Sequence, residues 1–459
     1  MFRKKALGYL NKKREELVRI SKEIWDEPEL AYDEYFASKI ISEYLKSEGF
    51  EVELGYADIP TAIRASYGSG GPVVGLLGEY DALPRLSQKV GTSQVPIKEG
   101  GPGHGCGHNL LGVSKLAAAV AIKEGLQQEG LDGTIVFYGC PAEEVLTGKP
   151  LMARAGAFKE LDMALAWHPS NHNMARYGSN TAVNSAKFHF KGITAHAAAD
   201  PHNGRSALSA VELMNVGANY LREHVTNDVR IHYVITDGGG EAPNVVPESA
   251  TVFYYVRAFT RKAVVDVYDR LVKIAKGAAM MTETELDIEF LGGCYNYLPN
   301  RTLVDLLDKV MRETDTPEWT EEEIEFAKEL NSKTDNYEKV IQAGLAKEGQ
   351  HLATEVLPQS DEPIYASTDV GDVSHIVPTG SFVTATQNIG APGHSWQVVS
   401  CSGHSIGQKG MIYAAEVMVG VMDEILKDPT IIERAKEEFE DQMGGQEYIC
   451  PIPDDLPIP

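Results

Sequence analysis

The stretch GPGHGCGHN at residues 101–109 places Cys106 and His108 two positions apart, with His104 just before them. An alanine- and leucine-rich run follows and predicts a helix from Asn109 to about Gly130. Thiolate and imidazole suit zinc and its transition-metal neighbours, and in a glycine-rich turn both side chains can point at one ion. We therefore expect a metal site here. The alternative is an ordinary loop before a helix, with a buried cysteine and a surface histidine.

The size and composition of the chain limit its possible class. A length of 459 residues predicts two or three domains. The net charge of −24 argues against nucleic acid or an anionic membrane as a partner, although local cations can still bind a small anionic substrate. We find no run of about 18 apolar residues, so we expect no membrane span. The five scattered cysteines form no CxxC pair, which predicts a reducing cytoplasm.

Strands and helices alternate in the first and last parts of the chain, which predicts a mostly parallel, three-layer α/β/α domain. The middle part differs. It contains four expected strands (near 181–190, 229–236, 249–258 and 285–291) and two expected helices (near 205–224 and 261–279). Their βαββαβ order is the ferredoxin-like pattern. We therefore predict a main domain in two parts, residues 1–180 and 297–459, interrupted by a small domain of residues 181–296.

Acidic residues and a histidine follow the expected strands of the main domain. Asp81 stands after the strand at 73–77, the pair Glu143 and Glu144 follows the strand at 134–138, and His168 ends the strand MALAWHP. Open α/β sheets bind their ligands at this edge. Each residue alone has an ordinary interpretation as a turn, solvated charge or packing residue, but their joint occurrence predicts a site.

Two histidines in the last part of the chain compete for a place in that site. His394 lies in APGHSW and His404 in CSGHS, and both follow the return of the α/β pattern. The residues alone do not decide between them.

Taken together, these motifs resemble a metallopeptidase family that includes aminoacylase, glutamate carboxypeptidase and the plant auxin-conjugate amidohydrolases. The similarity rests on GEYDALP, GHGCGHNLLG, CPAEE, AWHPS, STDVGDVSH and APGHSW, and it covers nearly the whole chain. Within the family these motifs are most similar to the aminobenzoyl-glutamate hydrolase branch. The resemblance implies a two-metal catalytic domain interrupted by a ferredoxin-like lid and dimerisation domain.

The resemblance also implies a set of metal ligands. These would bind two divalent ions, zinc or manganese, with Cys106 in a bridging role; the implied set is Cys106, His108, Glu144, His168 and His394. Where many members of the family have His-x-Asp, this chain has Glu79-Tyr80-Asp81. Asp81 is therefore expected to orient a ligand, and a ligand role for Glu79, Asp369 or Asp372 stays open.

Four further roles follow from the same resemblance. Glu143 matches the general base, and His196 in KGITAHAA resembles a lid histidine that reaches across a dimer to the partner's site. Asn244 and Arg257 match lid positions that recognise a substrate carboxylate, and we expect them beside the metal site. Arginine suits this task because its planar fork binds a carboxylate at two points.

The implied activity is metal-dependent hydrolysis of the amide bond of N-acyl amino acids. The first candidate substrate is p-aminobenzoyl-glutamate, cleaved to p-aminobenzoate and glutamate. The alternatives are a dipeptidase for dipeptides with a basic residue, a metal-bound regulatory subunit without turnover, and a cysteine hydrolase that uses Cys106 with His108 or His104. The implied assembly is a homodimer, or a heteromer with a related subunit.

Overall fold

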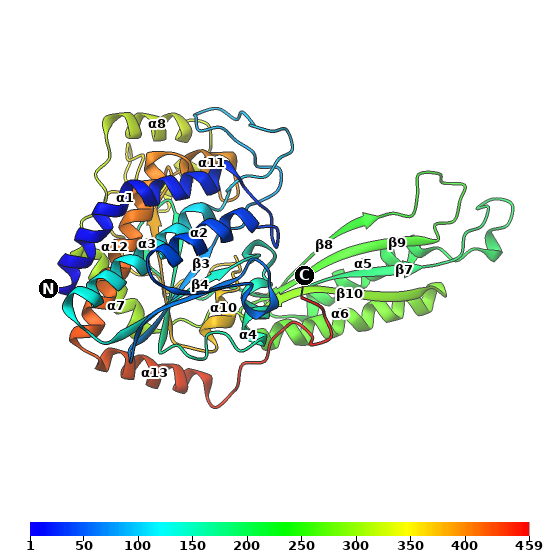
Figure 1. The fold of residues 1–459 in the computed structure, drawn as a ribbon. Coiled ribbons are helices and arrows are strands. Elements are labelled where there is room, and N and C mark those ends of the chain that lie inside the picture. Colours follow the sequence, from blue (N-terminus) through cyan, green and yellow to red (C-terminus); the bar gives the residue numbers. More distant parts are fainter. Residues whose placement is uncertain (459) are drawn as a thin grey trace.

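The computed structural model describes residues 1–458 and shows an α/β body from which a long, narrow lid projects (Figure 1). The body is built on a seven-stranded sheet in the order β1-β2-β4-β3-β5-β11-β6. Its strands are β1 (Glu51–Leu54), β2 (Ile63–Ser69), β3 (Val73–Glu79), β4 (Gly133–Cys140), β5 (Met163–Ser170), β6 (Met174–Ala175) and β11 (Thr379–Ala385).

The four central strands β4, β3, β5 and β11 are parallel, as expected, whereas the outer pairings β1–β2, β2–β4 and β11–β6 are antiparallel. The expectation of a mostly parallel sheet therefore holds only for its centre. A parallel pair needs a crossover of roughly a dozen residues or more, and the connection between β1 and β2 is shorter than that.

Alternation along the central strands produces the three layers. Ile135 and Phe137 of β4 belong to one hydrophobic cluster, whereas Val136 and Tyr138 belong to another. Successive side chains of a strand point to opposite faces, so both faces of the sheet are buried. The larger cluster includes α1 (Phe2–Asp26), α2 (Tyr35–Ser47), α3 (His108–Glu129), α7 (Arg301–Glu313), α12 (Ser405–Lys427) and α13 (Thr430–Met443), and the smaller one includes α4 (Gly148–Arg154) and α10 (Val370–Ser374). The predicted three-layer α/β/α fold is confirmed.

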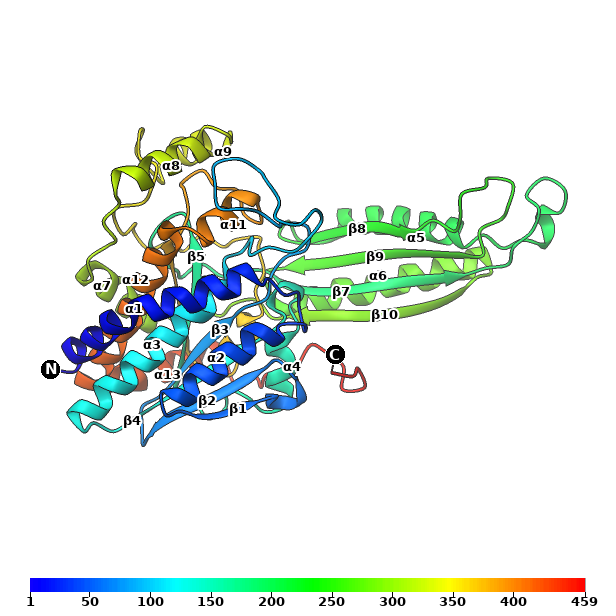
Figure 2. The same cartoon turned by 45° about the horizontal axis from the view of Figure 1, so that its top comes forward.

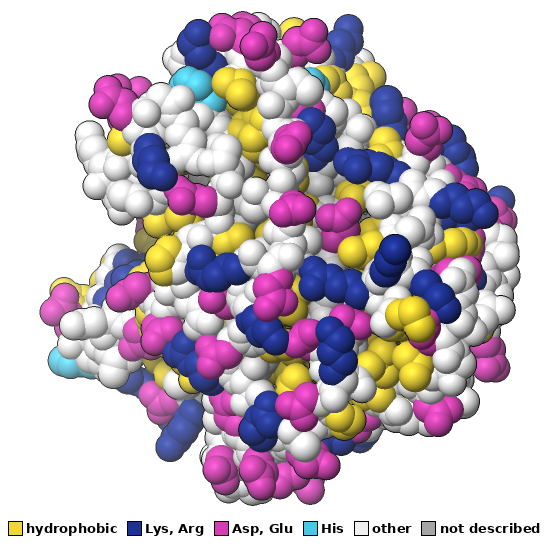
Figure 3. All heavy atoms as spheres, turned by 90° about the vertical axis from the view of Figure 1, so that its left-hand side faces the viewer, with side chains coloured by type: hydrophobic (Ala, Val, Ile, Leu, Met, Phe, Trp, Pro, Cys, Tyr) yellow, Lys and Arg dark blue, Asp and Glu magenta, His cyan; other side chains and the backbone are white. Residues whose placement is uncertain are grey.

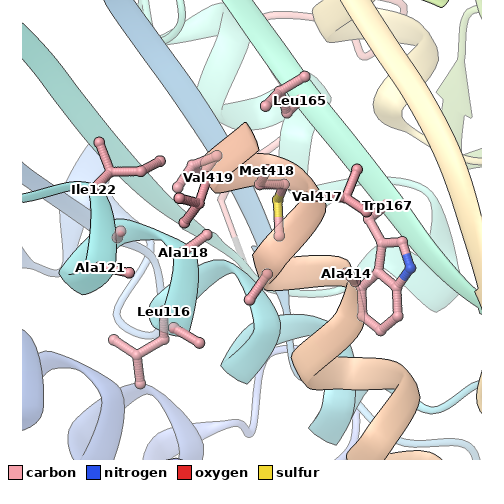
Figure 4. Close-up of a cluster of buried hydrophobic side chains, with 14 of the residues drawn as sticks. Leu116, Ala118, Ala121, Ile122, Leu165, Trp167, Ala414, Val417, Met418 and Val419 are labelled. Carbon is pink, nitrogen blue, oxygen red and sulfur yellow. The ribbon is translucent and has the colours of Figure 1, made fainter. Parts of the chain in front are cut away.

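Helix α3 lies in the centre of this packing and is buried along most of its length. It runs beside α12 and β5, and Figure 4 shows buried side chains of these three elements, among them Ala118 of α3, Val419 of α12 and Leu165 of β5. A side chain at Gly112 of the same helix would lie 2.7 Å from the carbonyl oxygen of Glu79. The absence of that side chain lets the start of α3 approach the end of β3 closely.

The lid is a four-stranded antiparallel sheet in the order β10-β7-β9-β8, with two helices on one face. Its elements are β7 (Ala182–Lys191), α5 (Ala207–Leu221), β8 (Arg230–Asp237), β9 (Ser249–Ala258), α6 (Arg261–Thr282) and β10 (Glu285–Cys294). This is the predicted βαββαβ order. The predicted domain limits at residues 180 and 296 lie just outside β7 and β10 and stay a prediction.

The lid sheet has one packed and one open face. Along β9, Val252, Tyr254 and Val256 are buried against α5 and α6, whereas the residues between them are partly exposed. The long strands lead away from the body to two loops at the far end of the lid, residues 192–206 and 238–248 (Figure 2).

The remaining helices α8 (Glu321–Asn331), α9 (Asn336–Gln342) and α11 (Trp396–Ser402) complete the body. On the face shown in Figure 3, acidic and basic side chains are interspersed. All five cysteines are free. Within residues 1–458, no helix has the length and apolar character needed to cross a membrane.

Candidate metal centre

The ends of β3, β4 and β5 meet the start of α3 at one edge of the central sheet. His108 is the first residue of α3 and follows Gly107, whose φ of 80° is left-handed and so favours glycine. Glu143 and Glu144 lie in a short 3-10 helix directly after β4. His168 belongs to β5 itself. The fold thus brings together the residues that the sequence motifs single out.

The two histidines are each held by one ring nitrogen. Nδ1 of His108 donates to Asp81 Oδ1 at 2.9 Å, and Nδ1 of His168 donates to the carbonyl of Pro169 at 2.7 Å. An imidazole that donates through Nδ1 has its free lone pair on Nε2. Both Nε2 atoms face the site: that of His168 lies 3.2 Å from Cys106 Sγ, and that of His108 is buried without a hydrogen-bond partner.

Asp81 also positions the acidic side of the site. Its Oδ2 accepts a hydrogen bond of 2.8 Å from the backbone N–H of Glu144. The same carboxylate therefore orients His108 and the turn that carries Glu144. Such outer partners of metal ligands fix ring orientation and tautomer.

The atoms that could bind metal, called donor atoms below, form two donor groups, and the Cys106 thiol belongs to both. Cys106, His108 and His168 place their donor atoms within 4.8 Å of one another, and so do Cys106, Glu144 and His394. Oε1 of Glu144 is buried and unpartnered, like His108 Nε2. A hydrogen-bond acceptor that is buried without a hydrogen-bond partner lowers the stability of the fold, unless a bound cation interacts with it. The thiol, imidazole and carboxylate set therefore fits divalent metal ions.

Glu79 is also close to His108 and Glu143, and these three could hold an ion by distance alone. Its Oε1, however, lies 2.6 Å from Nζ of Lys149, which also pairs with Asp369. Although burial opposes the charge of Lys149, the carboxylates of Asp369 and Glu79 raise its pKa well above the usual value. The negative charge of Glu79 is therefore already balanced by Lys149, whereas Oε1 of Glu144 has no hydrogen-bond partner.

Lys149 is the main structural residue of the centre that sequence reasoning missed. It lies in α4 and is completely buried, although lysine is rarely buried without a partner. The nearest sequence signal is its place a few residues after the glutamate pair, in VLTGKP. That signal becomes interpretable only when both carboxylate partners are known.

Burial sets the protonation of the donors. It lowers the pKa of His168 to about 4, so that its ring is neutral at pH 7. Burial, with the carboxylates of Glu79 and Asp369, raises the pKa of Glu143 well above its usual value. Burial also raises the pKa of the Cys106 thiol.

Of the two later histidines, His394 lies beside the residues of the site. Its Nε2 lies 3.7 Å from Glu144 Oε2, and its backbone has a left-handed φ of 51°. His404 instead caps α12 and stacks on Phe326. His104 contacts the carbonyl of Ile24. Neither His404 nor His104 shares a donor group with Cys106 in the described residues.

The other two aspartates whose ligand role was left open, Asp369 and Asp372, already have partners within the protein. Asp369 pairs with Lys149, and Asp372 accepts hydrogen bonds from Tyr448 Oη and the backbone of Tyr295. Neither belongs to a candidate ligand group within residues 1–458.

A cavity of about 660 Å³ opens from the donor groups toward the base of the lid. Its walls include donor side chains of the body and residues of β8 and β9, among them Arg230 and Arg257. Nη1 of Arg257 donates to Ser367 Oγ at 2.7 Å. Arg257 therefore lies where the sequence analysis expects it.

Asn244 and His196 lie elsewhere. The backbone N–H of Ala197 donates to the carbonyl of Asn244, and His196 pairs with Val245, so both residues sit in the loops at the far end of the lid. Strand β9 separates Asn244 from Arg257 by roughly 27 Å at about 3.4 Å per residue. Asn244 therefore lies away from its own chain's cavity, and its expected role in recognising the substrate carboxylate stays a prediction.

Residues 179–280 match the family model described as a peptidase dimerisation domain. The chain is 42% identical over 458 residues to one of the subunits of p-aminobenzoyl-glutamate hydrolase from Escherichia coli, a match that covers 96% of this chain and 95% of that protein. It is 27% identical to the Xaa-Arg dipeptidase of Mus musculus, covering 98% and 94%.

Among solved structures, the fold is similar to a dinuclear metal-binding peptidase of the M20 family from Bacillus subtilis. The TM-score is 0.60 at 16% identity, and the match covers 91% of this chain and 99% of that one.

Proposed function

The chain belongs to the M20 peptidase family and is a hydrolase of amide bonds, and we propose that its substrate is p-aminobenzoyl-glutamate, from which it releases glutamate. The similar Escherichia coli chain is a subunit of a hydrolase named for that compound. The observation that carries the proposal is the cavity that joins the metal-donor groups to arginines at the base of the lid. One end holds residues suited to hydrolysis, and the other offers cations to an anionic amino acid.

The proposed ligands are the two donor groups that share Cys106. Cys106, His108 and His168 would hold one ion, and Cys106, Glu144 and His394 the other, with zinc or manganese as the metal. Two bound ions would lower the pKa of a water between them and polarise the amide carbonyl. Glu143 would take the proton of the attacking water on its carboxylate and deliver it to the leaving amide nitrogen. Asp81 would hold His108 and the Glu144 turn in place throughout.

The far end of the lid supports an active dimer. His196 and Asn244 lie together in loops remote from their own cavity, and both belong to the segment that matches a dimerisation domain. We propose that they serve the cavity of a partner chain. The partner would be a second copy or a related chain, the latter because two different subunits of the Escherichia coli hydrolase are both similar to this chain.

The dipeptidase alternative is less well supported. The similar mouse protein is named an Xaa-Arg dipeptidase, but Arg176, Arg230 and Arg257 line the cavity of this chain. These cations would repel a substrate with a basic side chain. A regulatory subunit without turnover would have no need of the buried Glu143 beside His108.

The test is a substrate panel with a lid variant. The purified chain, supplied with zinc or manganese, is assayed on p-aminobenzoyl-glutamate, on the matching α-carboxamide, and on lysine-ended dipeptides. We expect p-aminobenzoyl-glutamate to be preferred. We expect Arg257→Ala to lower kcat/KM for it far more than for the α-carboxamide, because a charge-assisted contact is lost only with the carboxylate.

A strong preference for lysine-ended substrates, with Arg257→Ala behaving like wild type, would refute the glutamate assignment and leave the amide hydrolase in place.

A further inference from the structure

Three arginines of the cavity lack an anionic partner. Arg176, Arg230 and Arg257 all line it, and within residues 1–458 none of them forms an ion pair. The carboxylates at the other end of the cavity lie beside Lys149 and His108, and within the described residues they form no ion pair with these arginines. Arg230 is exposed and solvated, whereas Arg176 and Arg257 are partly buried without a counter-charge, which favours the binding of an anion in this cavity.

Two of these arginines form a pair on the lid. Arg230 of β8 and Arg257 of β9 are directly opposite each other in the antiparallel register, so their side chains point to the same face. Like charges at such positions destabilise a sheet. Their hydrogen bonds go only to neutral oxygens, namely Ser367 Oγ for Arg257 and two backbone carbonyls for Arg230. An anion bound between the two guanidinium groups would remove the repulsion.

Arg176 forms a separate cationic position on the body. It follows β6, where its backbone N–H donates to the carbonyl of Ser381 at 2.9 Å. Its side chain is half-buried, and its guanidinium has no hydrogen bond to any of residues 1–458. The cavity therefore has cations on two walls, one carried by the lid and one by the body.

We propose that the cavity selects a released amino acid with two carboxylates, in which the Arg230–Arg257 pair binds the α-carboxylate and Arg176 binds the side-chain carboxylate. This inference rests on the proposed amide hydrolysis at the same site. A cavity of about 660 Å³ is of the size that holds an aromatic acyl group together with glutamate. A single carboxylate would leave one of the two walls without a counter-charge.

The test compares two substrates that differ only in the side-chain carboxylate, N-benzoyl-L-glutamate and N-benzoyl-L-glutamine. Wild type should prefer the glutamate substrate by about 10- to 100-fold in kcat/KM, as expected for a charge-assisted hydrogen bond. Arg176→Gln should abolish this preference by lowering the value for glutamate while leaving that for glutamine nearly unchanged. Arg230→Gln should lower both values together. Arg19→Gln, on the exposed face of α1, is the matched control.

Equal losses on both substrates in Arg176→Gln, with an unchanged melting temperature, would overturn the assignment. Arg176→Lys, which keeps the charge but not the fork, should retain part of the preference and serves if the glutamine variant does not fold. If wild type hydrolyses neither substrate nor p-aminobenzoyl-glutamate, the proposed function fails. Calorimetric titration of the two compounds then decides the inference alone: it stands if Arg176→Gln loses the tighter binding of the glutamate compound, and falls if wild type shows no such preference.

Discussion

Replacing Asp81 with asparagine should weaken metal binding while leaving the fold intact. The carboxylate is completely buried and accepts two hydrogen bonds, from His108 Nδ1 at 2.9 Å and from the backbone of Glu144 at 2.8 Å. Asparagine has nearly the same shape but only one acceptor oxygen, so its NH₂ group must face one of these donors. If it faces His108, the ring accepts through Nδ1 and protonates Nε2, which can then no longer bind a metal.

The magnitude follows from these contacts. Losing a buried hydrogen bond to a charged group costs about 1.5–3 kcal/mol, which corresponds to the roughly 10- to 100-fold loss of metal affinity typical of such outer positions. The assay is a titration of metal-free protein with buffered zinc, followed by calorimetry and by elemental analysis after gel filtration. Activity should recover in part at saturating metal.

Asp162→Asn is the matched control, because Asp162 also accepts a backbone hydrogen bond, from Val73, but lies outside the donor groups. It should leave the zinc affinity unchanged. Wild-type zinc affinity in Asp81→Asn, with normal circular dichroism, would refute the claim that Asp81 orients the metal centre.

Three further predictions concern groups of the site. Glu143→Gln should keep its bound metal but lose about 10²- to 10⁴-fold in kcat, and near-normal turnover would remove Glu143 from the mechanism. A His196→Ala chain mixed with a Glu143→Gln chain should regain activity, since one site of each mixed dimer then has both groups; no recovery despite proven subunit exchange would exclude action in trans. Lys149→Met should lower the free energy of unfolding by about 3–5 kcal/mol at pH 7, measured with urea, because two buried carboxylates lose their partner. Burial raises the pKa of Asp369 to about 6 even though Lys149 lowers it. Without the lysine this pKa rises further, so the variant takes up the proton at a higher pH than wild type, and the loss should shrink as the pH falls toward about 6 and stay level below it. A loss that grows as the pH falls toward about 6 would contradict the explanation.

The fold was largely predictable because its signals are local and periodic. Strand β9 was predicted at its observed limits, since Val252, Tyr254 and Val256 alternate with less buried residues. The order of elements in the lid then followed from counting strands and helices. The antiparallel outer pairings of the body were missed, because pairing at the edge of a sheet depends on connections and packing rather than on the pattern within a strand.

The candidate metal ligands could be predicted because each of several sequence motifs contains at least one of them. The shape of the cavity was not predictable, because its walls also include residues that no motif contains. Arg176 is a single arginine after a two-residue strand, and Arg230 acquires its significance only from its register opposite Arg257. The position of Asn244 depends on the length of β9, which moves it to the far end of the lid even though it is close to Arg257 in sequence.

The separate hydrophobic core of the lid has a consequence for how such enzymes diversify. The lid helices pack on their own sheet, apart from the two clusters that support the metal-donor groups. Substitutions on the open face of β8 and β9 therefore need no compensating change beneath the hydrolytic centre. Substrate contacts carried by the lid can therefore change without repacking the core of the body, and exchanging the lid between relatives that are named for different substrates offers a practical way to redirect the enzyme.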